Sequence, residues 1–149
     1  MLRHIPPPFW ALLLLAGLYY LSELPVLAEL PLWREKRIGG VMMLLGLVPP
    51  TASIMHFFAV GTQVHPTSAT NNKLVSSGFY AFTRNPMYLG LIVFSLGAAI
   101  WMGRPLMYLA PLGVFAIANW VFIPFEEAKM RRQFGAEFDA YTQKVRRWL

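Results

Sequence analysis

Four long apolar stretches constrain the fold of this chain more than any other feature. Residues 5–32 carry only Glu23 and Glu29 as charged groups, and three further stretches contain no Asp, Glu, Lys or Arg: 38–64, 85–103 and 105–125. Since about 20 apolar residues cross the hydrocarbon core as a helix, each stretch is long enough to span a membrane. Helices satisfy their own backbone hydrogen bonds in lipid. The sequence therefore predicts an all-α integral membrane protein.

The composition agrees with this class. Only 13% of the residues are charged, against about 25% in soluble domains. The first stretch follows Arg3, as in a signal peptide, but Glu23-Leu24-Pro25 stands where a small-residue cleavage site would be, which favours a retained span. The absence of cysteine and the spacing of the three histidines predict no metal site. The net charge of +6 lies beside the spans and indicates contact with anionic membrane lipids rather than nucleic acid.

We treat residues 1–149 as a single membrane domain. We expect about four spans, at 8–28, 38–60, 86–102 and 105–124. A polar loop covers 61–85, and an amphipathic tail helix covers 125–146. Two adjacent prolines, Pro49 and Pro50, predict a kink or break in the second span. Pro86 suits the first position of the third helix, with Asn85 as its N-cap.

The connection between the last two spans predicts where the polar residues meet. It consists of Gly103 and Arg104, which leaves room only for a tight helical hairpin. The two spans are then antiparallel, and their outer ends return to the same face of the membrane. We therefore expect Arg84 and Asn85 to lie close to Glu126 and Glu127.

The tail carries apolar residues at helical spacing, namely Met130, Phe134, Phe138, Tyr141 and Val145. A basic amphipathic helix of this kind is typical of the membrane interface. Its Lys and Arg residues place the C-terminus in the cytoplasm by the positive-inside rule. Four spans would then leave the basic residues of 34–37 outside. Either the first span does not cross the membrane fully, or the basic residues of the tail determine the orientation against those of 34–37. We favour the second explanation.

The polar residues at the span ends predict a pocket. Arg84 and Tyr88 share a helix face if the third helix begins slightly early. Glu126 and Glu127 open the tail helix, and Asn119 lies on nearly the same face unless Pro124 rotates it. Such a pocket suits a zwitterionic or cationic ligand, together with an apolar partner that enters from the lipid.

Each residue also has a purely structural interpretation. Arg84 is a candidate for a snorkelling anchor, Tyr88 for an aromatic belt, and the two glutamates for a favourable helix start. His56 suits an interhelical hydrogen bond and His65 a solvated loop. Glu23 is either an intramembrane functional carboxylate or a residue near the end of its span.

Two sequence blocks resemble a known superfamily. The first is Leu74-Val75-x-x-Gly78-x-Tyr80 followed by Arg84-Asn85-Pro86-Met87-Tyr88-x-Gly90. The second, about forty residues later, is Glu126-Glu127 with Phe134-Gly135-x-Glu137-Phe138-x-x-Tyr141 and Val145-x-Arg147. Together they resemble the signature of the isoprenylcysteine carboxyl methyltransferase and phospholipid methyltransferase superfamily, from about Gly61 to the end of the chain.

The resemblance implies an integral membrane enzyme that methylates a lipidic or prenylated acceptor with S-adenosylmethionine. It implies a location in a bacterial or archaeal inner or plasma membrane, with the cofactor site facing the cytoplasm. The polar loop at 61–85 would hold the cofactor. The cofactor-binding residues it implies are Leu74, Val75, Gly78, Tyr80, Arg84, Asn85, Pro86, Tyr88, Glu126 and Glu127, of which Arg84, Asn85, Tyr88 and Glu127 are the catalytic candidates. The resemblance suggests that a glutamate would bind the amino group of the cofactor and Arg84 its carboxylate.

The chain departs from the family pattern at three positions. Phe79 replaces a proline, Ala81 a basic residue, and Asn85 a histidine. Asparagine at this position is an alternative common in shorter members of the family, and it removes a possible base. A prenylcysteine carboxylate needs no base, whereas a phospholipid amine does. Two alternatives stay open: an NADPH-dependent enzyme similar to sterol reductases, and a non-catalytic membrane scaffold.

Overall fold

The computed structural model describes residues 6–61 and 73–149, and every regular element in these ranges is helical. Most of the predicted polar loop, including His65, lies outside the described residues. The elements are, in order, α1 (Pro7–Ser22), α2 (Pro25–Ala28), α3 (Lys36–Val60), η2 (Gly78–Ala81), α4 (Pro86–Met102), η3 (Pro105–Tyr108), α5 (Leu109–Ile117), η4 (Ala118–Phe122), α6 (Ile123–Phe134) and α7 (Ala136–Lys144).

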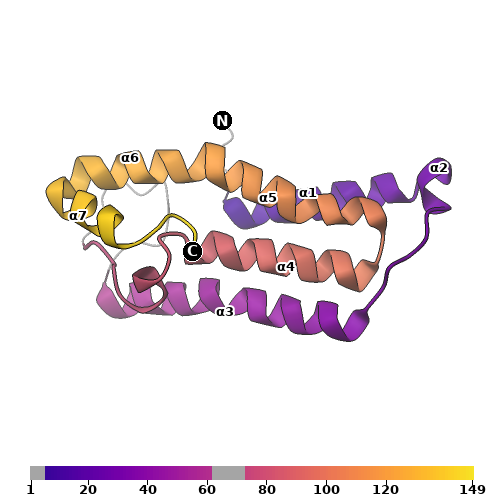
Figure 1. Ribbon diagram of the computed structural model, residues 1–149, viewed down its shortest axis with the longest axis horizontal. Coiled ribbons are helices and arrows are strands. Elements are labelled where there is room, and N and C mark those ends of the chain that lie inside the picture. Colours follow the sequence, from indigo (N-terminus) through magenta and orange to yellow (C-terminus); the bar gives the residue numbers. More distant parts are fainter. Residues whose placement is uncertain (1–5, 62–72) are drawn as a thin grey trace.

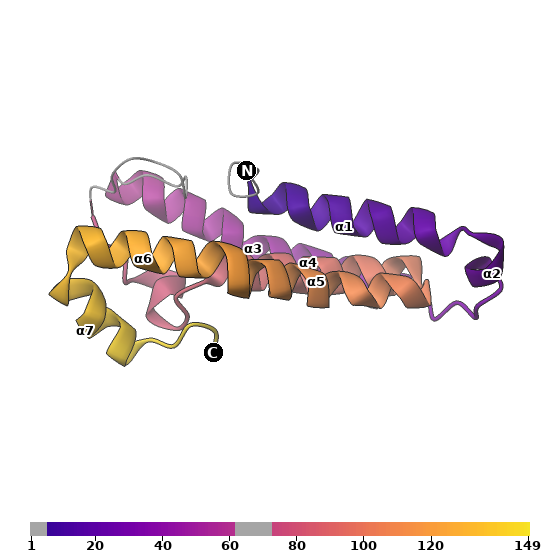
Figure 2. The same cartoon turned by 90° about the horizontal axis from the view of Figure 1, so that it is seen from above.

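The long helices form an elongated bundle in which α4 lies between α3 and α5 (Figure 1). Helix α1 packs along α5 on the other side, as the view from above shows (Figure 2). We call the end of the bundle with α2 and the start of α3 the α2 end. The opposite end, with α6, α7 and the start of α4, is the α7 end.

Glycines bring α3 and α4 into backbone contact. A Cβ added at Gly39 would lie 2.7 Å from the carbonyl oxygen of Gly97, and one added at Gly46 would lie 2.8 Å from that of Gly90. On each helix the two glycines are seven residues apart, which is close to two turns, so they share one face. Small residues of this kind let membrane helices approach closely.

The proline pair does not break the second long helix. Helix α3 continues without interruption from Lys36 to Val60 through Pro49 and Pro50, so of the predicted kink or break, the break does not occur. The ring of Pro50 lies against Gly90 of α4, where any larger residue would collide with it. This packing holds the proline-containing segment in place, as neighbouring helices commonly do for prolines in membrane helices.

The first predicted span is divided. Helix α1 ends at Ser22, and α2 is a separate short helix that begins at Pro25, because proline cannot donate the hydrogen bond that would continue α1. Glu23 forms an ion pair with Arg104 of the α4–η3 connection. The carboxylate therefore lies at the α2 end with a cationic partner.

The last long helix contains a π-helical segment. This continuous helix runs from Pro105 to Phe134, and its π-helical segment is η4, just before Pro124. A proline leaves one carbonyl of the preceding turn without its donor, and a π turn accommodates this local mismatch. The extra residue in the turn changes the register between Asn119 and Glu126.

The tail is two helices rather than the single one predicted over 125–146. Gly135 adopts a φ of +49° between α6 and α7, a region that glycine enters without steric cost. The chain turns back there, so α7 folds under α6 (Figures 1 and 2).

The apolar face of the tail is also used differently from the prediction. Phe138, Tyr141 and Val145 form a buried cluster, against which Met130, Phe134 and Leu74 pack. The apolar residues of the tail contact one another and the segment before η2, because α7 folds back.

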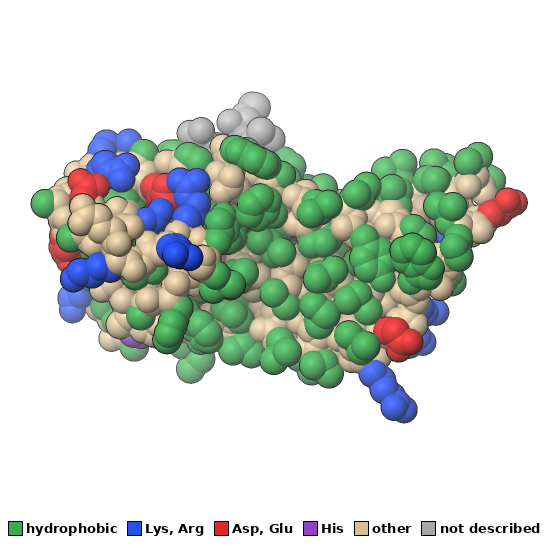
Figure 3. All heavy atoms as spheres, in the orientation of Figure 1, with side chains coloured by type: hydrophobic (Ala, Val, Ile, Leu, Met, Phe, Trp, Pro, Cys, Tyr) green, Lys and Arg blue, Asp and Glu red, His purple; other side chains and the backbone are tan. Residues whose placement is uncertain are grey.

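Two helical segments are long and apolar enough to cross a membrane, namely α3 and the continuous helix from Pro105 to Phe134. Helices α1 and α4 are apolar but have 16 and 17 residues. Hydrophobic side chains cover the middle of the visible face, whereas Lys, Arg, Asp and Glu gather at its ends, most densely over α6 and α7 (Figure 3).

Candidate functional site

The two polar clusters meet at the α7 end. The Tyr88 hydroxyl donates a hydrogen bond to Glu126 Oε1 at 2.6 Å, and Arg84 Nη2 donates to Glu127 Oε1 at 2.9 Å. The antiparallel pair formed by α4 and the following long helix brings these residues together across about forty positions of sequence. The predicted proximity of the clusters is confirmed.

Arg84 reaches this site from outside the helix. It precedes α4, which begins at Pro86, so the predicted helix face shared with Tyr88 is wrong. Its backbone N–H donates to the carbonyl oxygen of Arg146 at 3.0 Å. Its Nη1 donates to the carbonyl oxygens of Thr142 and Val145, each at 3.2 Å. The end of α7 therefore fixes the guanidinium.

Asn85 occupies the predicted N-cap position of α4, but its side chain makes no capping hydrogen bond. The amide nitrogen Nδ2 instead donates to the carbonyl oxygen of Arg147 at 2.8 Å. The hydroxyl of Thr83 donates to the same oxygen at 3.2 Å. Asn85 is buried at 6% exposure, so its amide fastens the start of α4 to the C-terminal residues.

A cavity of about 330 Å³ lies beside these contacts, a volume at the lower end of the range for small-molecule sites. Its apolar wall includes Pro50, Ile54 and Phe57 of α3, and Phe138 of α7. Eight of the ten predicted cofactor residues line it: Leu74, Val75, Tyr80, Arg84, Asn85, Tyr88, Glu126 and Glu127.

The other two predicted residues lie outside the lining. Gly78 begins η2 with a φ of +62° and lines a second, apolar pocket on the far side of Tyr80. Pro86 is fully buried at the start of α4. Both positions shape the backbone that carries the lining residues, Gly78 through its positive φ and Pro86 through its fixed φ.

Two tyrosines close one side of the cavity. The ring of Tyr80 stacks on Phe57 with ring centres 5.3 Å apart, and the Tyr141 hydroxyl donates to the carbonyl oxygen of Tyr80 at 2.7 Å. Burial raises the pKa of Tyr141 to about 12 and also raises the pKa of Tyr80. Both phenols are therefore neutral at physiological pH, and Tyr141 keeps the proton that it donates.

Sequence reasoning missed two charged residues of the site. Arg147 donates from Nη2 to Glu127 Oε2 at 2.6 Å and from Nε to Glu127 Oε1 at 3.1 Å. The Val145-x-Arg147 pattern was the available signal, but nothing in a helical reading of the tail brings Arg147 back to α6. Lys129, one turn after Glu126, lines the cavity and is 9% exposed.

Asn119 and His56 have structural partners. Asn119 accepts a hydrogen bond from the Trp148 indole at 3.2 Å and does not line the cavity. His56 Nε2 and the Ser77 hydroxyl are hydrogen-bonded at 2.8 Å, which ties α3 to the segment before η2.

The sequence of this chain is similar to those of known proteins. The phospholipid methyltransferase family matches residues 35–137. A probable protein-S-isoprenylcysteine O-methyltransferase of Oryza sativa subsp. indica is 30% identical over 138 residues, covering 87% of this chain and 69% of the relative. Protein-S-isoprenylcysteine O-methyltransferase B of Arabidopsis thaliana is 27% identical, covering 89% and 68% respectively.

The fold has a solved counterpart. The eukaryotic intramembrane Ras methyltransferase ICMT (isoprenylcysteine carboxyl methyltransferase) superposes with a TM-score of 0.61 at 23% identity. The match covers 92% of this chain and 49% of that one, so this chain spans about half the length of the solved protein.

The family match and the named relatives define the class of the protein as a membrane methyltransferase, and its helical fold resembles that of a solved intramembrane protein. The chain belongs to the phospholipid methyltransferase family. The resemblance drawn from the two sequence blocks is confirmed, and the reductase and scaffold alternatives lose their support.

Proposed function

We propose that this protein transfers a methyl group from S-adenosylmethionine to a lipidic acceptor, with a prenylated cysteine carboxylate as the preferred class. The relatives named above act on isoprenylcysteine. A carboxylate acceptor is already deprotonated and requires no base, which suits a chain with Asn85 where the family pattern has histidine. A phospholipid amine is the second acceptor class, favoured by the family match.

The observation that carries the proposal is that a carboxylate, Glu126, and a guanidinium, Arg84, line the same cavity. Glu126 offers a carboxylate that accepts a hydrogen bond from Tyr88. Arg84 Nε is buried and has no hydrogen-bond partner among the described residues. Buried N–H groups in proteins almost always have a hydrogen-bond acceptor. A carboxylate of the ligand would supply this acceptor for Arg84 Nε, and Glu126 suits an ammonium group of the ligand. The residues therefore fit the amino-acid portion of S-adenosylmethionine.

When bound, S-adenosylmethionine supplies a methyl group carried on a positively charged sulfur. The contribution of the protein is alignment and exclusion of water, which govern an in-line transfer more than proton movement does. Tyr88 orients the Glu126 carboxylate, and the apolar wall from α3 and α7 keeps the cavity dry. Asn85 acts by fixing the start of α4.

We further propose that α1, α3, α4 and the segment η3–η4 all cross the bilayer. At a rise of about 1.5 Å per residue, α1 and α4 extend for roughly 24–26 Å, slightly less than the hydrocarbon thickness. Local thinning of the bilayer accommodates a mismatch of this size. The cavity would then open at the cytoplasmic surface.

The test is binding of S-adenosylmethionine to the purified protein in detergent, measured by isothermal titration calorimetry. Glu126→Gln keeps the shape of the side chain but removes its charge, so we expect the dissociation constant to rise at least about tenfold, as for a charge-assisted hydrogen bond. Glu137→Gln makes the same change at an exposed position of α7 and serves as the matched control.

Equal binding by Glu126→Gln and wild type would remove Glu126 from the cofactor site. Binding of NADPH instead of S-adenosylmethionine would overturn the proposed chemistry. Methyl incorporation into prenylcysteine analogues and into phospholipids, compared in one assay, distinguishes the two acceptor classes.

A further inference from the structure

The C-terminal segment, residues 145–148, is tied to the start of α4 and to the last long helix. Its backbone accepts hydrogen bonds from the Arg84 N–H, the Thr83 hydroxyl and the Asn85 amide. Trp148 packs on Phe115 with ring centres 5.0 Å apart and donates to Asn119. These contacts fix the backbone of Arg147 between the start of α4 and the segment formed by α5 and η4.

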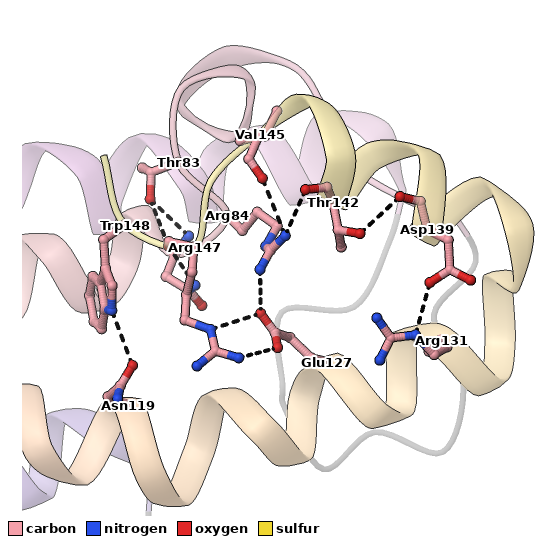
Figure 4. A network of polar contacts seen from close by, with 11 residues as sticks. Thr83, Arg84, Asn119, Glu127, Arg131, Asp139, Thr142, Val145, Arg147 and Trp148 are labelled. Carbon is pink, nitrogen blue, oxygen red and sulfur yellow. Dashed lines mark hydrogen bonds and ion pairs between the residues drawn. The ribbon is translucent and has the colours of Figure 1, made fainter.

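From this position Arg147 and Arg84 hold the same carboxylate (Figure 4). Glu127 Oε1 accepts from both guanidinium groups, and Oε2 accepts from Arg147 alone. The Glu127 side chain is 17% exposed, and Arg84 is 15% exposed. Bidentate pairs of arginine with carboxylate are strong and directional, so both oxygens of Glu127 are already committed within the protein.

The two adjacent glutamates therefore differ in what they can bind. Both line the cavity, but Glu126 accepts a hydrogen bond from Tyr88, whereas Glu127 is shared by two cations. The trio of Arg84, Glu127 and Arg147 carries a net charge of +1, which leaves the trio suited to an anionic group. Arg147 does not line the cavity, and its guanidinium reaches the cavity lining through Glu127.

We infer that Arg147 is a positioning residue: by holding Glu127 it fixes the start of the polar part of α6 and thereby directs the Glu126 carboxylate to the cofactor. Glu127 is a structural link rather than a ligand. This inference rests on the proposed function for the identity of the ligand, but the link between Arg147 and Glu127 can be tested without any ligand.

The experiment is a double-mutant cycle with Arg147→Gln, Glu127→Gln and the double variant. We expect each single variant to raise the dissociation constant for S-adenosylmethionine about tenfold, and the double variant to match the singles, because residues in one network are coupled. Arg147→Lys keeps one charged hydrogen bond and should recover part of the affinity. Arg146→Gln removes the same charge from an exposed neighbouring side chain and should bind like wild type.

Thermal unfolding without ligand is the second readout. Non-additive shifts in the unfolding midpoint for positions 127 and 147 support the link, even if S-adenosylmethionine fails to bind the wild type and the proposed function falls. Additive effects in both readouts, or equal behaviour of Arg147→Gln and Arg146→Gln, overturn the inference. If Arg147→Gln does not fold, Arg147→Lys replaces it in the cycle.

Discussion

Glu126 and Glu127 are neighbours in the chain, yet their side chains meet different partners. Consecutive residues on a helix point about 100° apart, so one faces the cavity and Tyr88 while the other faces the two arginines. Burial of a carboxylate is costly unless it is paired. The Tyr88 hydroxyl therefore supplies one of the partners that let Glu126 lie beside apolar side chains.

Removal of the Tyr88 hydroxyl tests this role. Tyr88→Phe leaves the packed ring in place but takes the donor from Glu126, so we expect S-adenosylmethionine to bind about three- to tenfold more weakly, the range for one typical intramolecular hydrogen bond. Tyr108→Phe removes a similar hydroxyl, bonded to the Trp33 carbonyl at the α2 end, and serves as the control. Unchanged affinity for Tyr88→Phe would show that the hydroxyl does not orient the carboxylate.

At the scale of elements, the contact of α3 with α4 decides the shape of the cavity. Gly90 belongs to the sequence block that carries Arg84 and Tyr88, and it is the residue against which the Pro50 ring packs. Pro50 in turn lines the cavity. The glycine of the motif therefore acts through packing, because it allows α3 to supply a wall of the site.

A methyl group on this contact face should destabilise the bundle. A Cβ at Gly46 would lie 2.5 Å from the Phe94 backbone nitrogen, so Gly46→Ala must separate the helices, at a cost of about 1–3 kcal/mol. We expect a lower unfolding midpoint in detergent. Gly17→Ala in α1 meets no atom within 4 Å and should leave the midpoint unchanged or raise it slightly, as helix propensity favours alanine. A lowered midpoint for Gly17→Ala alone would contradict the assigned contact.

At the scale of the whole molecule, charge is distributed unevenly between the two ends. Among the described residues, the α7 end carries Lys73, Arg84, Lys129, Arg131, Arg132, Lys144, Arg146 and Arg147, whereas the α2 end carries Arg34, Lys36, Arg37 and Arg104. By the positive-inside rule this difference favours a cytoplasmic α7 end. In that orientation the basic residues of 34–37 would lie on the outer side, where they are fewer than the basic residues of the α7 end.

Labelling with a membrane-impermeant maleimide tests this orientation, and the natural absence of cysteine makes single-cysteine variants unambiguous. Phe82→Cys and Lys144→Cys are exposed at the α7 end, and Glu29→Cys is exposed at the α2 end. We expect the first two to react only from the cytoplasmic side and the third only from the opposite side. Reaction of Phe82→Cys and Lys144→Cys from opposite sides would refute the shared cavity.

The sequence by itself determined the helical class, the family and most of the lining of the site. Hydropathy over long windows and a two-residue hairpin are local properties, and they suffice to bring Arg84 and Tyr88 to the two glutamates. Pro86 at the start of α4 follows from local rules in the same way.

Only the tertiary structure decided which contact each side chain makes. Asn85 binds a carbonyl of the C-terminal segment instead of capping its helix, Pro50 is held by a glycine of another helix, and Arg147 returns to Glu127 because Gly135 turns the tail back. These contacts depend on residues distant in sequence that become neighbours only when the helices pack. Helical periodicity describes one helix at a time, so it cannot specify them.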